Sequence, residues 1–313
     1  MAQLRVYLFG RFRVQYDDEP VTGLELAKVQ ELFCYLLLFA GRAHTRDKLI
    51  ALLWDNHTAA QSRRYLRHAL WQLHTALGDH PGLAADFLHV EPDWLHVHPT
   101  DGLWTDVWAF EQAFARAQGR PSDALDAEDA CCLSEAVRLY GGDLLENWYQ
   151  DWCIFERERL QSMYLTILDK LMDYHERHGN YEVGVSYGTH ILRHDRARER
   201  THRRLMRLHA LAGDRTAALR QYRVCVRALQ DELGVDPAQG TQRLYEQIRA
   251  DRPPDALPTP PATPAPPTPT AAVDSTPAAL LAELLHSFNH LQTILHHIQH
   301  QVDSNIESLK GLL

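Results

Sequence analysis

The stretch that decides the fold of the N-terminal part is residues 59–77, AAQSRRYLRHALWQLHTAL. When successive residues are placed 100° apart, its leucines fall on one stripe, which a stable helix must bury against a core. The same stretch contains three arginines and no acidic residue. It therefore predicts a helix with one apolar face and one basic face.

The polar face of this helix carries the side chains that a reader of the DNA major groove needs. Arginine forks and glutamine amides match the edges of bases, and planar side chains reach the thymine methyl group. An arginine near the helix start suits a phosphate contact, which fixes register rather than sequence. Gln61 and Tyr65 also lie on this polar face. The alternative to a DNA-binding helix is an ordinary amphipathic helix whose polar face is solvated. The residues that we predict to bind double-stranded DNA are Arg63, Arg64, Arg67, His68, Trp71, Gln72 and Thr75.

The sequence on either side of this helix predicts strands, helices and a hairpin. Apolar residues alternate over residues 4–16, as strands require, and helical periodicity holds over residues 24–77. A strand pair at 87–90 and 94–97 follows, with an acidic turn at its tip. Strands, three helices and a hairpin are the elements of a winged helix-turn-helix, which we expect over residues 1–98.

Residues 99–251 predict a separate helical domain. Its helical pattern is broken by short turn sequences, and Gly179-Asn180-Tyr181 and Gly213-Asp214-Arg215 are 34 residues apart. This is the period of tetratricopeptide-like helical hairpins. Seven arginines fall between residues 193 and 207. We expect them to form the solvated face of a repeat helix, paired with nearby acids.

These two modules resemble the SARP-type regulators. Residues 43–54 and 63–78 are similar to the OmpR/PhoB-type winged helix of that family, and residues 105–248 resemble the bacterial transcriptional activator domain that follows it. The landmarks of the second module are Tyr140-Gly141-Gly142-Asp143-Leu144-Leu145, Asp151–Leu160, Gly213–Tyr222 and Glu232-Leu233-Gly234-Val235-Asp236-Pro237. The resemblance implies a helical-repeat domain that contacts the winged helix, a second protomer or RNA polymerase.

The C-terminal part predicts a linker and a coiled coil. Residues 252–277 contain ten prolines and no aromatic residue, which is typical of an extended spacer. Residues 278–313 carry apolar residues in heptads, with Asn305 as the one polar seam position, so we expect this helix to mediate self-association. Docking on the chain's own body is the alternative. Two i, i+4 histidine pairs in this tail lie off the seam and lack a third ligand, so no metal site is predicted.

Composition excludes several classes of protein. The net charge of −9 argues against holding nucleic acid by bulk positive charge, and five cysteines without a CxxC pair indicate reduced thiols. No apolar run is long enough to span a bilayer, and no signal peptide is evident, so a cytoplasmic location is expected. Motifs for nucleotide binding or for hydrolytic catalysis are absent, so we expect neither an enzyme nor a cofactor.

Two functions follow from these observations. The first is a mainly α-helical, sequence-specific transcriptional regulator, an activator that binds tandem DNA sites and contacts RNA polymerase. The alternative is a tetratricopeptide-like interaction scaffold whose winged helix no longer binds DNA. The acidic hairpin tip, with Glu91 and Asp93, favours this alternative because carboxylates repel a phosphate backbone.

Overall fold

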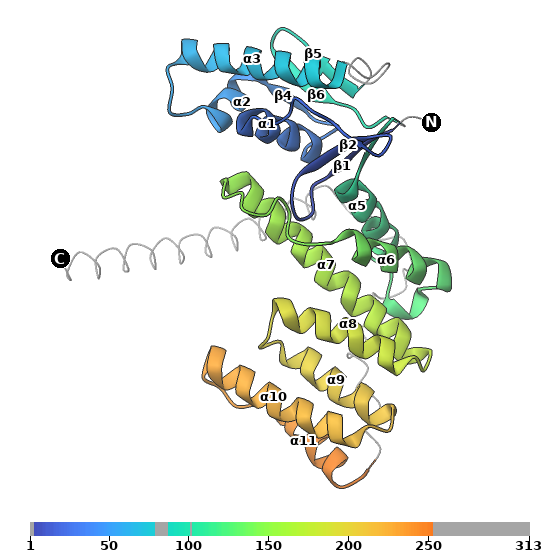
Figure 1. Cartoon of the computed structure of the whole chain (residues 1–313). Coiled ribbons are helices and arrows are strands. Elements are labelled where there is room, and N and C mark those ends of the chain that lie inside the picture. The colour runs from blue at the N-terminus through green and yellow to red at the C-terminus, as the bar shows by residue number, and fades with distance from the viewer. Residues whose placement is uncertain (1–2, 79–86, 101, 253–313) are drawn as a thin grey trace, which may run out of the picture. The chain divides into compact units, whose positions relative to one another are not determined.

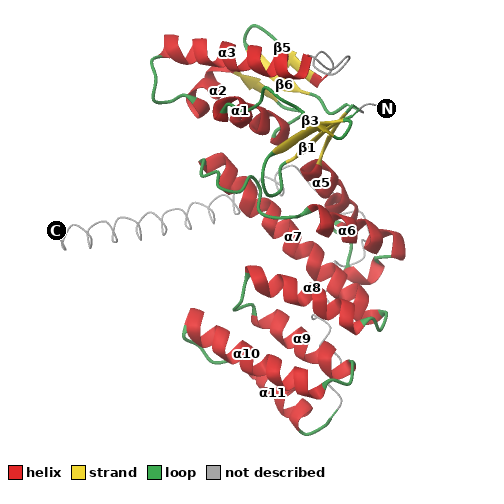
Figure 2. Cartoon of the chain, in the orientation of Figure 1, coloured by secondary structure: helices red, strands yellow, loops and turns green. Residues whose placement is uncertain are grey.

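The computed structural model describes residues 3–78, 87–100 and 102–252, and residues 1–255 form one compact unit. The predicted coiled coil and all but the first residue of the predicted linker lie outside the described residues. The described chain is mainly helical, and its strands all belong to a small N-terminal sheet region (Figure 1, Figure 2).

The N-terminal elements are β1 (Leu4–Tyr7), β2 (Arg13–Tyr16), β3 (Glu19–Pro20), α1 (Ala27–Leu38), β4 (Ala43–Thr45), α2 (Arg46–Leu53), α3 (Ala59–Gly78), β5 (Leu88–Val90), β6 (Trp94–Val97) and β7 (Leu103–Thr105). The elements that follow are α5 (Asp106–Ala117), the 3-10 helix η1 (Ser122–Ala124), α6 (Ala127–Leu139), α7 (Asp151–Arg177), α8 (Tyr181–His194), α9 (Glu199–Leu211), α10 (Arg215–Leu233) and α11 (Gln239–Arg249).

The first sheet has the strand order β3-β2-β1-β7. Strand β2 runs antiparallel to β1, whereas β7 runs parallel to it. Leu4, Val6 and Leu8 are all buried, because alternate residues of a strand share one face. The alternating pattern of residues 4–16 therefore predicted β1 and β2 correctly, but it gave no sign of β7.

The second sheet, in the order β4-β6-β5, accompanies the three helices α1, α2 and α3. Strands β5 and β6 form the predicted hairpin, and β4 adds a strand that the sequence did not predict. Thr45 ends β4 and also caps α2, because its Oγ1 accepts a hydrogen bond from the Lys48 N–H at 3.4 Å. The order of these elements is the one expected for residues 1–98, and their assignment as a winged helix stays a prediction.

Helices α5 to α11 pack in series, each against the next. The turns after α7 and α9 contain Gly179 and Gly213, whose φ angles of 72° and 81° lie in the left-handed region that favours glycine. The 34-residue spacing thus marks two equivalent turns, whereas the tetratricopeptide assignment stays a prediction. The break between α8 and α9, at residues 195–198, contains neither glycine nor proline and was not foreseen.

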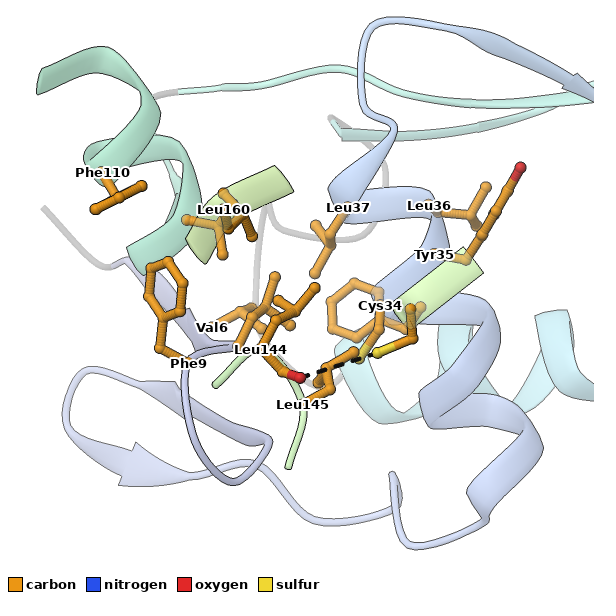
Figure 3. Close-up of a cluster of buried hydrophobic side chains, with 14 of the residues drawn as sticks. Val6, Phe9, Cys34, Tyr35, Leu36, Leu37, Phe110, Leu144, Leu145 and Leu160 are labelled. Atoms are coloured by element: carbon orange, nitrogen blue, oxygen red, sulfur yellow. Dashed lines mark hydrogen bonds between the residues drawn. The ribbon is translucent and has the colours of Figure 1, made fainter. Parts of the chain in front are cut away.

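One apolar core runs through both parts of this compact unit (Figure 3). The labelled side chains come from β1 and the residues after it, from α1, α5 and α7, and from the segment between α6 and α7; they include Val6, Phe9, Leu36, Leu37, Phe110, Leu144, Leu145 and Leu160. The segment between α6 and α7 is also hydrogen-bonded to the end of β1. The N–H of Gly10 donates to the Asp143 carbonyl at 2.8 Å, and the N–H of Leu145 donates to the Leu8 carbonyl at 2.8 Å.

Asp106, the first residue of α5, joins the first sheet to the helices. Its carboxylate accepts hydrogen bonds from the backbone N–H groups of Leu8 (2.9 and 3.0 Å), Phe9 (3.0 Å) and Val107 (2.8 Å). Burial raises the pKa of this carboxyl to about 6, although the hydrogen bonds from Leu8 and Phe9 act to lower it. Asp106 is thus a buried acid at the junction of two elements.

The arginines between residues 193 and 207 are more buried than expected. At least four of them form ion pairs, as expected, but the Arg204 side chain is only 3% exposed. It lies between α9 and α7 and pairs with Asp169, Asp173 and Glu176. The expectation of a solvated face is wrong for Arg204, because α9 turns this residue toward the acids of α7.

Within the described ranges, no helix combines the length and the apolar character that a membrane span requires.

Candidate nucleic-acid interface

The start of α3 is fixed by reciprocal hydrogen bonds. The N–H of Thr58 donates to Gln61 Oε1 at 3.2 Å, and the N–H of Gln61 donates to Thr58 Oγ1 at 3.4 Å. This arrangement is a capping box. The hydroxyl of Ser62 also donates to the Trp54 carbonyl at 3.1 Å, which ties α3 to the end of α2. Gln61 therefore caps the helix, and its amide oxygen is not free to read a base.

The structure places the two faces of α3 as the sequence predicts. The apolar face is buried and consists of Leu66, Ala69, Leu70, Leu73, Ala76 and Leu77, together with Ser62. Six of the seven predicted DNA-binding side chains are exposed, and Gln72 is half-buried. Trp71 is 62% exposed. An exposed indole forgoes the stabilisation that burial of its apolar surface would give. Such exposure is typical of a side chain that a partner covers.

A groove of about 780 Å³ lies along one side of α3. Arg63 and Arg67 line it from α3, Arg46 lines it from α2, and Pro92 and Asp93 line it from the hairpin tip. Three guanidinium groups thus border one concave surface together with the carboxylates of Asp47 and Asp93, and the remaining excess of positive charge suits a phosphate backbone.

A second groove, of about 390 Å³, lies along the other side of α3. His68 and Gln72 of α3 line it, together with Tyr65 and with Lys28 from the start of α1. Because Lys28 forms an ion pair with Glu31 at 2.7 Å, part of its charge is compensated. The predicted site residues are therefore divided between two grooves.

The crest of α3 lies between the two grooves and carries Arg64, Trp71 and Thr75. The ring of Trp71 lies 5.8 Å from that of His68. The hydroxyl of Thr75 donates to the Trp71 carbonyl at 2.9 Å, so its proton is already used within the helix. Thr75 therefore offers a partner only its methyl group and an acceptor oxygen, which makes it the weakest of the predicted base contacts.

Sequence reasoning missed Arg46. The guanidinium of Arg46 donates to the Glu91 carbonyl at 3.2 and 3.1 Å. The backbone N–H of Arg46 donates to the Asp93 carbonyl at 3.0 Å. Arg46 thereby holds the hairpin tip beside α3. The sequence did contain an indication. A cation directly after the N-cap Thr45 interacts unfavourably with the helix dipole, which suggests that Arg46 has a role outside its own helix.

Over residues 3–78, 87–100 and 102–252, no group of three or more His, Cys, Asp or Glu residues is placed to hold a metal ion. The chemistry that α3 and its two grooves offer is hydrogen bonding and charge attraction. Cations and planar side chains face outward, and the carboxylates of Glu91 and Asp93 stand at one edge.

Comparison with known proteins gives matches to regulatory proteins. Residues 105–249 match the family described as the bacterial transcriptional activator domain. The chain is 29% identical over 248 residues to the regulatory protein AfsR of Streptomyces coelicolor, which covers 78% of this chain and 24% of that protein. It is 26% identical over 249 residues to AfsR of Streptomyces griseus, covering 79% and 25% respectively. This chain therefore spans about a quarter of the length of these relatives.

The fold is similar to that of EmbR from Mycobacterium tuberculosis, which was solved in complex with a low-affinity phosphopeptide. The two share a TM-score of 0.68 at 19% sequence identity, over 81% of this chain and 66% of that chain. At this identity the likeness concerns the fold.

Proposed function

We propose that this chain, whose residues 105–249 match a bacterial transcriptional activator domain, is a SARP-type transcriptional regulator that binds double-stranded DNA sequence-specifically through α3. The observation that carries the proposal is the outer surface of α3. It presents arginines and an exposed indole between two grooves, while its leucines are buried. The proposal is supported by the fact that a major groove admits an α-helix and that arginine donors match base edges there.

The position of each side chain suggests its role. Arg64, Trp71 and His68 stand at or near the crest and would reach base edges. Arg63 and Arg67 border the larger groove and would contact phosphates, with Arg46 beside them. Gln72 would read a base edge from the opposite side of the helix, and Thr75 would add a methyl contact.

The further parts of the proposal rest on the family resemblance and on the tail sequence. We infer that the protein is a cytoplasmic activator that binds tandem sites and contacts RNA polymerase through its helical domain. Its protomers associate through residues 278–313. Neither a cofactor nor catalysis is part of this function.

An interaction scaffold is the second candidate, and the hairpin tip favours it. Glu91 and Asp93 are exposed at the edge of the groove that Arg63 and Arg67 line. In a scaffold, α3 would dock on a protein that carries complementary acidic groups. DNA binding measured over a range of salt concentrations separates the two candidates. A regulator binds DNA with an affinity that falls steeply as the salt concentration rises, whereas a scaffold has no DNA affinity to lose.

The proposal is tested by selecting bound fragments from random and genomic DNA with purified full-length protein. The test variant is Arg64→Ala/Arg67→Ala, whose side chains are exposed, so that the fold is retained. The matched control is Arg220→Ala/Arg223→Ala, which removes the same charge from the exposed surface of α10. We expect an enriched motif with the native chain and with the control, and none with the test variant.

Two outcomes would contradict the proposal. Native protein that is folded and enriches no sequence at low salt would put the scaffold in its place. Equal loss of enrichment in both variants would show that net charge, not α3, determines binding.

A further inference from the structure

Three histidines gather on the hairpin beside α3. His89 on β5 and His96 on β6 are cross-strand partners, and His98 follows two residues after His96. The ring centroids of His96 and His98 are 3.7 Å apart, those of His89 and His98 are 5.3 Å apart, and those of His89 and His96 are 6.4 Å apart. His89 and His98 are exposed and His96 is half-buried. The three imidazoles therefore form one cluster on the outer face of the hairpin.

No salt bridge neutralises this cluster in the part of the chain that the structure describes, because no carboxylate there forms an ion pair with the three histidines. The hairpin tip, with Glu91 and Asp93, holds the acids of this sheet. On the inner face, the strand β4 contributes His44, whose pKa is lowered by burial and by the charges of Lys48, Arg42 and His96.

Helix α1 packs against the inner face of the same sheet and places Tyr35 beside His44, with ring centroids 5.3 Å apart. Burial, together with the charges of His98 and His89, lowers the pKa of His96. Among the described residues, the groups named here around the cluster are thus apolar or cationic, apart from the hairpin tip.

The cluster continues the surface that α3 presents. Thr45, which borders the groove of Arg63 and Arg67, is the cross-strand partner of Trp94. The ring of Trp94 lies 6.0 Å from that of His96. From Trp94 to His98 the outward residues of β6 and the residue after it extend about 13 Å. Figure 1 shows β5 and β6 next to α3, so a duplex seated on α3 lies within reach of the hairpin.

We propose that the histidine cluster makes DNA binding depend on pH, because the outer face of the β5–β6 hairpin attracts backbone phosphates when His89, His96 and His98 are protonated. This inference rests on the proposed DNA-binding function. Residues 88–98 contain two acids and these three histidines, so the formal charge of the hairpin changes from −2 to +1 when all three are protonated. The hairpin with the acidic tip thereby becomes attractive to phosphate at the lower end of the physiological pH range.

Binding and protonation strengthen each other. Three imidazolium groups this close repel one another, and a phosphate placed among them removes that repulsion. DNA therefore raises the affinity of the cluster for protons, and by linkage protons raise its affinity for DNA by the same factor. DNA affinity should increase as the pH falls from about 8 to about 6, because protonation of the cluster adds positive charge to the hairpin.

The test measures binding of the full chain to a fluorescent duplex that carries the selected motif, by anisotropy, at pH 8 and pH 6 over a range of salt concentrations. For the native chain we expect about tenfold tighter binding at pH 6. Its plot of log affinity against log salt should also be steeper by about 1 to 2 at pH 6, because each neutralised phosphate adds roughly 0.9 to the slope. The variant His89→Gln/His96→Gln/His98→Gln should show the pH 8 affinity and slope at both pH values.

Two further variants keep the test decisive. His89→Lys/His96→Lys/His98→Lys carries the charge permanently, so it should bind at pH 8 as tightly as the native chain does at pH 6. His178→Gln/His190→Gln removes histidines of the helical domain and should keep the native pH dependence. If the glutamine variant fails to fold, as judged by circular dichroism, the lysine variant decides the question.

The inference is overturned if the glutamine variant keeps the native pH dependence, which would assign it to His57, His68 or His74. It is also overturned if the lysine variant binds no more tightly at pH 8 than the native chain. Native protein that binds its motif equally at both pH values defeats this inference alone. Native protein that binds no DNA at either pH defeats the proposed function, and the inference with it.

Discussion

At the scale of single residues, Asp106 makes stability depend on pH. Its pKa of about 6 in the folded chain is above its usual value of 3.8, so the folded state holds this proton more tightly than the unfolded state does. Asp106 therefore contributes stability below pH 4 that is lost as the pH rises through 6. The change is on the order of 3 kcal/mol, since one pKa unit corresponds to about 1.4 kcal/mol.

The substitution Asp106→Asn tests this dependence. It places an amide NH₂ among backbone donors that the carboxylate now accepts, so we expect the free energy of unfolding to fall by about 1–3 kcal/mol at pH 7. The variant should also lose the decrease in stability that the native chain shows between pH 4.5 and 7. Urea unfolding at several pH values measures both effects, with the exposed Asp195→Asn as control. Parallel pH curves for native and variant chains would show that Asp106 does not titrate in this range.

At the scale of elements, α8 passes between its neighbours by means of glycines. A Cβ atom at Gly188 would lie 2.7 Å from Leu205 Cδ2 and 3.0 Å from both Leu205 Cγ and Met172 Cε. These side chains belong to α9 and α7, so α8 is clamped between two helices. Glycine is normally unfavourable inside a helix, which indicates that the close approach outweighs its cost of about 1 kcal/mol.

We expect Gly188→Ala to destabilise the chain by about 1–3 kcal/mol despite the better helix propensity of alanine, because the added methyl overpacks this contact. The change is measured as a shift in the midpoint of urea unfolding. Ser186→Ala, on the exposed surface of the same helix, is the control and should be neutral or slightly stabilising. A stabilised Gly188→Ala chain would show that α8 has room to move.

How much the sequence predicts depends on element length and on how near a strand's partner lies in the sequence. The amphipathic pattern of helix α3 repeats over 20 residues, so the ends and the buried face of this helix were predictable. Strands β4 and β7 have three residues each and no partner close to them in the sequence, whereas the equally short β5 was predictable together with β6 across their turn. Strands β4 and β7 form because tertiary partners complete them, and β7 exists as a strand only beside β1.

The candidate site shows the same division. Exposure of Arg64 and Trp71 follows from periodicity within one helix. The two grooves depend on Arg46, Lys28 and Asp93, which other elements bring to α3, and no local pattern predicts that. Gln61 shows the opposite limit, since it stays exposed on α3 but its amide oxygen is used in the local cap.

At the scale of the whole molecule, we expect residues 278–313 to hold protomers together. Leu291→Asp/Ile298→Asp places two charges on the apolar seam of the predicted coiled coil, which should dissociate the oligomer because a heptad interface requires apolar seam residues. Light scattering coupled to gel filtration measures the mass. His286→Asp/His290→Asp puts equal charge on positions away from the seam and should leave the mass unchanged. The expectation would be contradicted if the native chain were monomeric, or if the Leu291→Asp/Ile298→Asp variant kept the mass of the native oligomer.

The pairing of β1 with late parts of the chain has a consequence for synthesis on the ribosome. Strand β1 gains its parallel neighbour only from β7, and the residues after it gain further hydrogen bonds from Asp143 and Leu145. Synthesis must therefore continue past residue 105 before the free edge of β1 can pair, and past residue 145 before the residues after β1 gain their hydrogen bonds. Until β7 emerges, one edge of β1 is unpaired, and an open strand edge is a template for wrong association. Strand β1 thus emerges well before the segments that protect it, and its safe folding depends on how quickly translation delivers them.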